Sequence, residues 1–191
     1  IDSSLAKPSK ALDVHMGLDG QNFDCVRCHT TTLHNISGRT YATPAATSRK
    51  RLIEDDLASK IMCESCHSST PHKPGVKAND HTDKVACQSC HIPEFARVNA
   101  TKMSWDWSKA GQKKDGKPFA KKGPHGKPTY DTKKGEFRWE KNVQPAYFWF
   151  NGAINAITAR DTIDPSQPVA INWPAGSRAD ENARIFPFKV H

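Results

Sequence analysis

The stretches "CVRCH" at 25–29, "CESCH" at 63–67 and "CQSCH" at 87–91 are three copies of one pattern, and they decide how this chain folds. In each copy, two residues separate a pair of cysteines, and a histidine follows the second cysteine directly. All six cysteines of the 191-residue chain lie in these three CxxCH phrases. Any function assigned to these cysteines must therefore also explain the histidine that follows each pair.

Three kinds of chemistry use closely spaced cysteines. A secreted disulfide framework gives no reason for a histidine after every pair. In a zinc ribbon, two cysteine pairs supply the four ligands of one zinc ion, so a third pair would have no partner pair. Covalent haem c needs this pattern, because two thiols form thioethers with the vinyl groups and the adjacent histidine reaches the iron. The phrases therefore predict three covalently attached haem c groups. The predicted binding residues are Cys25, Cys28, His29, Cys63, Cys66, His67, Cys87, Cys90 and His91.

The composition agrees with a chain that is organised around cofactors. Hydrophobic residues make up 36% of it, and it contains thirteen prolines and eleven glycines. Three macrocycles would add apolar surface that the side chains do not supply. The formal net charge is +8, but haem propionates would offset much of it, so the lysines do not require a nucleic-acid partner. Nothing approaches the length of apolar sequence that a membrane span needs.

The sequence predicts two regions. Residues 1–92 form a three-haem region, and residues 93–191 form a cysteine-free region that contains all five tryptophans and packs on the haems. Within the second region, residues 109–134 are rich in lysine, glycine and proline, which is typical of an exposed loop or hairpin.

Few elements are expected between these landmarks. "SRKRLIEDDLASKIM" at 48–62 has apolar residues at helical spacing, and a helix is expected to begin at Pro93 and continue through 94–103. "VQPAYFWF" at 143–150 is the most apolar run and predicts a buried strand or helix against a haem edge or a neighbouring chain. Strand is otherwise scarce. The predicted fold class is mainly α with much irregular structure, organised around covalently bound haems.

The second axial ligand of each iron decides what a haem can do. A second histidine saturates the iron and suits electron transfer, whereas an open position admits a substrate. The distal candidates are His15, His34, His72 and His81. Two of them follow a proximal histidine by only five residues, so each is better placed to ligate a neighbouring haem than its own. Four candidates for three irons leave one surplus, which is either a bystander or a ligand to an iron outside this chain.

The remaining histidines are weaker candidates. His125 lies at a Gly/Pro turn and His191 is the last residue, so both are expected to be solvated. Methionine ligation would raise the reduction potential, and the surplus of histidines disfavours it.

Longer stretches around the phrases resemble a known family. They are "DVHMGLDGQNFDCVRCH" at 13–29, "NDHTDKVACQSCHIPEFAR" at 79–97, "TKMSWDWSKAG" at 101–111, "YFWFNG" at 147–152 and "RIFPFKVH" at 184–191. In this order they resemble the C-terminal half of the octahaem tetrathionate reductase family of multihaem cytochromes c. That resemblance implies a periplasmic or extracellular protein with histidine ligands on all haems but one. The exceptional haem has an axial lysine and reduces small nitrogen and sulfur compounds.

The chain departs from this family in having three phrases rather than an octahaem set. The resemblance therefore implies that the catalytic haem lies outside this chain, and no catalytic residue is expected within it. The chain begins at Ile1 without a signal peptide, which suggests a processed or excised piece.

We therefore expect a carrier of electrons through three haems with paired histidine ligands, as the electron-transfer part of a tetrathionate, nitrite or hydroxylamine reductase-like protein. Its partner is then a redox protein or the haem-bearing remainder. The alternatives are a subunit of a polymeric multihaem conduit, with haem ligation across chains, or a reductase with an open catalytic haem.

Overall fold

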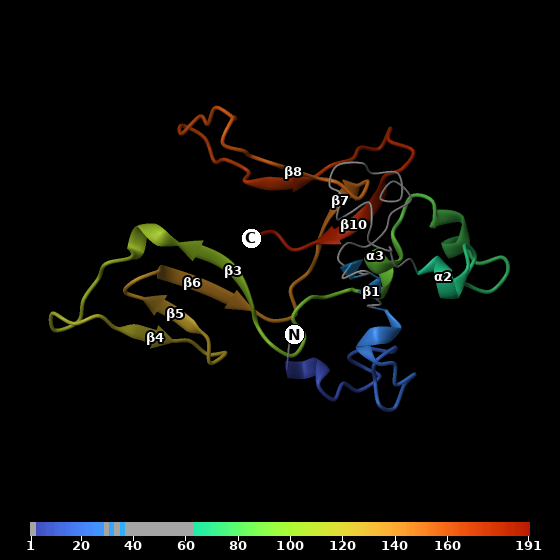
Figure 1. The fold of residues 1–191 in the computed structure, drawn as a ribbon, viewed down its shortest axis with the longest axis horizontal. Coiled ribbons are helices and arrows are strands. Elements are labelled where there is room, and N and C mark those ends of the chain that lie inside the picture. Colours follow the sequence, from blue (N-terminus) through green and yellow to red (C-terminus); the bar gives the residue numbers. More distant parts are fainter. Residues whose placement is uncertain (1–2, 29–30, 33–34, 37–62) are drawn as a thin grey trace. The chain divides into compact units, whose positions relative to one another are not determined.

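The computed structural model describes residues 3–28, 31–32, 35–36 and 63–191, and these are mainly β-strands and irregular backbone (Figure 1). The prediction of a mainly α fold is therefore wrong. In the described residues, α-helix is confined to α2 (Glu64–His67) and α3 (Cys87–His91), which are the second and third CxxCH phrases. Short 3-10 turns make up the rest of the helical backbone: η1 (Ser3–Leu5), η2 (Cys25–Arg27), η4 (Lys77–His81) and η5 (Trp107–Lys109).

The helix expected after Pro93 does not form. Ala96 adopts a left-handed backbone with φ of 59°, which interrupts any helix through this segment. Phe95 instead pairs with Val143 in an isolated antiparallel bridge, and a strand begins at Thr101. The other expected helix, at 48–62, lies outside the described residues. None of the helices in the described ranges is long and apolar enough to cross a membrane.

The chain divides into two compact units, and each is made of segments that lie far apart in the sequence. Unit 1 comprises Ile1–Phe23, Ile92–Ala146 and Phe188–His191, and unit 2 comprises Asp24–His91 and Tyr147–Pro187. All three CxxCH phrases lie within the span of unit 2.

Unit 1 is built on a four-stranded antiparallel sheet in the order β3-β6-β5-β4 (Figure 1). Buried and exposed residues alternate along its inner strand, "GEFRWE" at 135–140, as a strand with one buried face requires. Gly135 and Phe137 are buried, while Glu136 and Arg138 are exposed. Gly135 has φ of 91° and a Cβ there would lie 2.0 Å from the Asp106 carbonyl oxygen, so only glycine fits. The strands are β3 (Thr101–Asp106), β4 (Ala120–Lys122), β5 (Pro128–Asp131) and β6 (Gly135–Glu140).

Aromatic rings and lysine side chains cover part of this sheet. Trp105 stacks on Trp107 with ring centroids 4.3 Å apart. The Lys102 Nζ lies 4.2 Å from the Trp105 ring and 4.5 Å from the Phe137 ring, as in cation–π contacts. The lysine-rich segment 109–134 contains β4 and β5, and most of its side chains are exposed.

In the described part of unit 2, the strands form three short two-stranded pairings. The most apolar run of the sequence forms a strand, β7 (Ala146–Phe150), which pairs with β10 (Arg184–Phe188). Phe150 is buried against Phe186, whereas Tyr147 and Phe148 remain exposed. The other pairs join β8 (Ile154–Ala156) to β9 (Asn172–Pro174) and β1 (Thr31–Thr32) to β2 (Asn35–Ile36).

Candidate haem-binding site

One helical turn carries the predicted binding residues of each fully described phrase. α3 runs from Cys87 to His91, and α2 from Glu64 to His67 with Cys63 as its N-cap. Residues three and four apart share one side of a helix, so a turn of this kind presents both thiols and the histidine together. In the first phrase, η2 covers Cys25–Arg27, and His29 lies outside the described residues. None of the six cysteines, all of which are described, forms a disulfide, and four of them are exposed.

β10 holds α3 in place from a distant part of the sequence. Ile185 makes a parallel bridge with Val85, and its carbonyl accepts from the Ala86 N–H at 3.0 Å. The Ser89 hydroxyl, inside the third phrase, donates to the same carbonyl at 2.8 Å. Contacts with β10, whose Ile185 lies 96 positions after Ser89, therefore fix the position of α3.

The second and third phrases meet at their cysteines. Burial raises the pKa of the Cys63 thiol to about 11, and the neighbouring Cys87 thiol and the Glu64 carboxylate add to this effect. Because these thiols are the first cysteines of two different phrases, the two attachment positions adjoin.

One distal candidate faces a proximal histidine of another phrase. The imidazole rings of His72 and His91 have centroids 6.0 Å apart and planes inclined by 9°. An iron with an imidazole nitrogen at about 2 Å on each side sets ring centroids roughly 6 Å apart. His72 follows the second phrase, so its ring lies opposite the proximal histidine of the third.

The other histidines are placed as follows. His15 is exposed in unit 1 with its ring 6.2 Å from that of Phe23. His67 and His81 are exposed, and the His81 carbonyl accepts from the Lys84 and Val85 N–H groups. His34 lies outside the described residues. Within the described ranges, no group of three or more His, Cys, Asp or Glu side chains is arranged to hold a metal ion.

An ion pair beside the second phrase was not evident in the sequence. Arg184 on β10 and Glu64 on α2 lie 2.8 Å apart, with side chains 14% and 24% exposed. Burial opposes ionisation of Glu64, but its backbone N–H and the Arg184 guanidinium lower the pKa of this carboxyl. No spacing rule links residues 120 positions apart, so the sequence carried no signal for this pair.

These residues fit haem c. The paired thiols and histidine share one helical turn, and the His72–His91 geometry suits an iron between two imidazoles. In addition, the buried Arg184 Nε has no hydrogen-bond partner in the described part of the chain. A buried N–H of this kind fits an anionic group such as a haem propionate.

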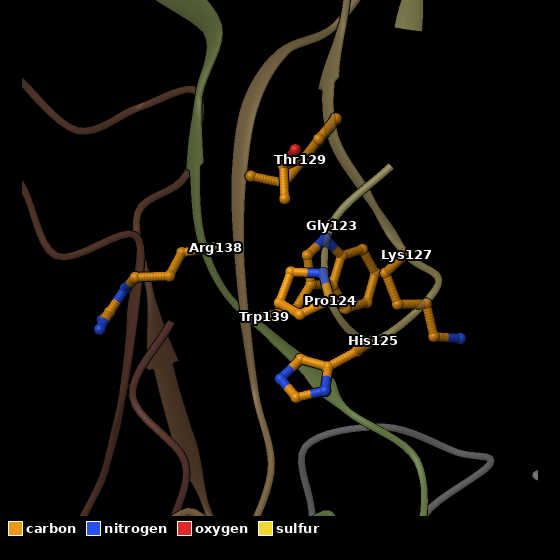
Figure 2. A pocket seen from close by; sticks show the side chains of 8 residues that line it. Gly123, Pro124, His125, Lys127, Thr129, Arg138 and Trp139 are labelled. Carbon is orange, nitrogen blue, oxygen red and sulfur yellow. The ribbon is translucent and has the colours of Figure 1, made fainter. Parts of the chain in front are cut away.

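A cavity in unit 1 is a poorer candidate. It has a volume of about 220 Å³ and is lined by Gly123, Pro124, His125, Lys127, Thr129, Phe137, Arg138 and Trp139. Figure 2 shows Pro124 and His125 beside the Trp139 ring, with Arg138 on the other side of its strand. Ligand pockets usually measure about 300–1,000 Å³, so this cavity is small for a ligand, and no cysteine lines it.

We expect the ion pair to stabilise unit 2 in a pH-dependent way. Because the folded state lowers the pKa of Glu64 from 4.5, the contribution is complete above pH 4.5 and is lost as pH falls through the lower folded value. Arg184→Gln should therefore lower the free energy of unfolding by about 1 kcal/mol at neutral pH and by less in acid. Urea titrations across this range measure the difference.

The matched control for this prediction is Arg138→Gln. Arg138 pairs with Glu140, but their side chains are 62% and 42% exposed, so its loss should change little. A pH-independent loss in Arg184→Gln would contradict the prediction.

Comparisons with known proteins agree with the fit. A model of bacterial cytochrome c matches residues 102–191, and a model of cytochrome c7 and related cytochromes c matches residues 10–92. The crystal structure of octahaem cytochrome c from Shewanella oneidensis matches all of this chain at 46% identity, with a TM-score of 0.83. This chain spans 40% of the length of that protein. No curated protein matches.

The cytochrome c7 match contains all three CxxCH phrases, the pattern through which haem c is attached, and the bacterial cytochrome c match covers most of the cysteine-free region. This chain is a multihaem cytochrome c that resembles the octahaem cytochromes c.

Proposed function

We propose that this chain binds three haem c groups, each with two histidine ligands, and carries electrons between them and a redox partner. Bound haem supplies reversible one-electron transfer. The thiol pairs Cys25/Cys28, Cys63/Cys66 and Cys87/Cys90 attach the groups, and His29, His67 and His91 are the proximal ligands.

The single observation that carries the proposal is the His72–His91 geometry. Parallel rings 6.0 Å apart suit two ligands of one iron. Two histidines saturate an iron, so this position favours electron transfer over substrate binding. The adjoining Cys63 and Cys87 thiols further support a short path between the second and third phrases.

The partner follows from a count of ligands. If His72 serves the third phrase, then His15, His34 and His81 remain for two irons, so one of them is still in surplus. We propose that the surplus histidine ligates an iron in the remainder of a longer octahaem protein, or in another chain. The 40% span of the octahaem relative supports this. The whole protein would be a periplasmic reductase of small nitrogen and sulfur compounds, with its catalytic haem outside this chain.

Intact mass and electron paramagnetic resonance of the haem-loaded protein test the proposal. We expect the mass of this chain with three haems, and low-spin ferric signals that nitrite and hydroxylamine do not alter. Fewer than three haems would refute the count. A high-spin ferric haem that binds either compound would instead indicate an enzyme with an open iron in this chain.

A further inference from the structure

The segment between the second and third phrases closes around one side chain, that of Asn79 on η4. Its Oδ1 accepts from the His72 backbone N–H at 2.9 Å, and its Nδ2 donates to the carbonyls of His72 at 3.1 Å and Lys73 at 3.3 Å. The same Oδ1 lies 3.3 Å from His72 Nδ1. One half-buried amide therefore holds both the backbone and the ring of His72.

The three backbone contacts settle which atom of the amide is which. An atom that accepts from a backbone N–H must be oxygen, and one that donates to two carbonyls must be nitrogen. Because Oδ1 can only accept, His72 must carry its proton on Nδ1 to bond with it. This leaves the lone pair on Nε2, the nitrogen that is free to bind a metal.

We propose that Asn79 is a positioning residue: it fixes the tautomer and ring orientation of His72, so that Nε2 is directed to the iron shared with His91. This inference rests on the proposed role of His72 as an axial ligand. Ligating histidines commonly donate their other ring N–H to a carbonyl or carboxylate, which orients the ring and raises its basicity. Removal of such a partner typically lowers metal affinity by about 10–100-fold.

The test uses the haem-loaded protein and cyanide as a probe of how readily the distal ligand leaves. Asn79→Ala should raise the apparent cyanide affinity of one haem by about 10-fold or more. It should also raise that haem's reduction potential, because a less basic imidazole stabilises ferric iron less. Asn79→Asp keeps the accepting oxygen and should retain cyanide affinity close to that of the unaltered protein, so it carries the test if the alanine variant does not fold.

Thr82→Val is the matched control. The Thr82 hydroxyl donates to the carbonyls of Ser69 at 3.2 Å and Asn79 at 3.1 Å, so it closes the same segment through contacts other than those to the His72 ring. We expect this variant to bind cyanide as the unaltered protein does. An equal effect from Thr82→Val and Asn79→Ala would show that Asn79 is merely structural, and would overturn the inference.

A double variant separates the inference from the proposed function. If Asn79 acts through His72, then Asn79→Ala should have no further effect on cyanide affinity once His72 is alanine. If His72→Ala alone changes no haem, the ligand assignment itself is wrong. If His72→Ala changes one haem but Asn79→Ala does not, only the positioning role is overturned.

Discussion

Replacing Cys87 and Cys90 together by alanine should remove one haem and unfold much of unit 2. The reason is the thin apolar core in the described part of that unit. Among the described residues, the buried hydrophobic side chains of unit 2 are Phe150 and the three alanines Ala86, Ala153 and Ala183. These four side chains, three of them alanine methyl groups, bury little area, so we expect bound haem to provide much of the hydrophobic stabilisation of the described part.

Mass spectrometry would count the haems, and limited proteolysis would report on folding. We expect two haems and rapid cleavage within 63–91 and 147–187. The single variant Cys90→Ala is the matched control, because Cys87 can still form one thioether and His91 can still bind the iron. Retention of three haems by the double variant, or protease resistance equal to that of the single variant, would contradict the prediction.

Replacing His72 by alanine should convert one of the three haems from low spin to high spin. His91 would then be the sole protein ligand of that iron, with the opposite side open. The remaining two haems should keep their signals, since the ring of His72 faces that of His91. The potential of the altered haem should also rise, because a strong donor to ferric iron is lost.

Spin quantification by electron paramagnetic resonance measures this change, with His125→Ala as the control. His125 lies in the small unit 1 cavity and is exposed, so its loss should leave all three haems low-spin. If His81→Ala rather than His72→Ala produced the high-spin haem, the pairing with His91 would be wrong.

The family and the cofactor could be predicted from sequence because their chemistry is local. The two thiols and the histidine of the third phrase lie within the five residues 87–91, so the haem-binding pattern can be identified without knowledge of any tertiary contact. The opposition of His72 and His91 could not be predicted, since it depends on how residues 68–86 close around Asn79, through backbone contacts that spacing does not encode.

The error in fold class has a different origin. The alternation of Gly135, Phe137 and Trp139 with charged residues is a period-two signal typical of a half-buried strand. An exposed loop or hairpin was predicted for the lysine-rich segment 109–134, and β4 and β5 pair there as antiparallel strands. The segment after Pro93 has a composition typical of a helix, but Ala96 adopts a left-handed backbone there. Phe95 instead pairs with Val143, a partner far along the chain that local sequence does not indicate.

The bond from Ser89 to Ile185 has a consequence for the order of assembly. It spans 96 positions, so the third phrase leaves the ribosome well before the strand that fixes its helix. Until that strand pairs, the helix that carries these thiols lacks the backbone contacts that fix it. Contacts of such high sequence separation form late and slowly, which gives covalent modification time to precede the closing of the native structure.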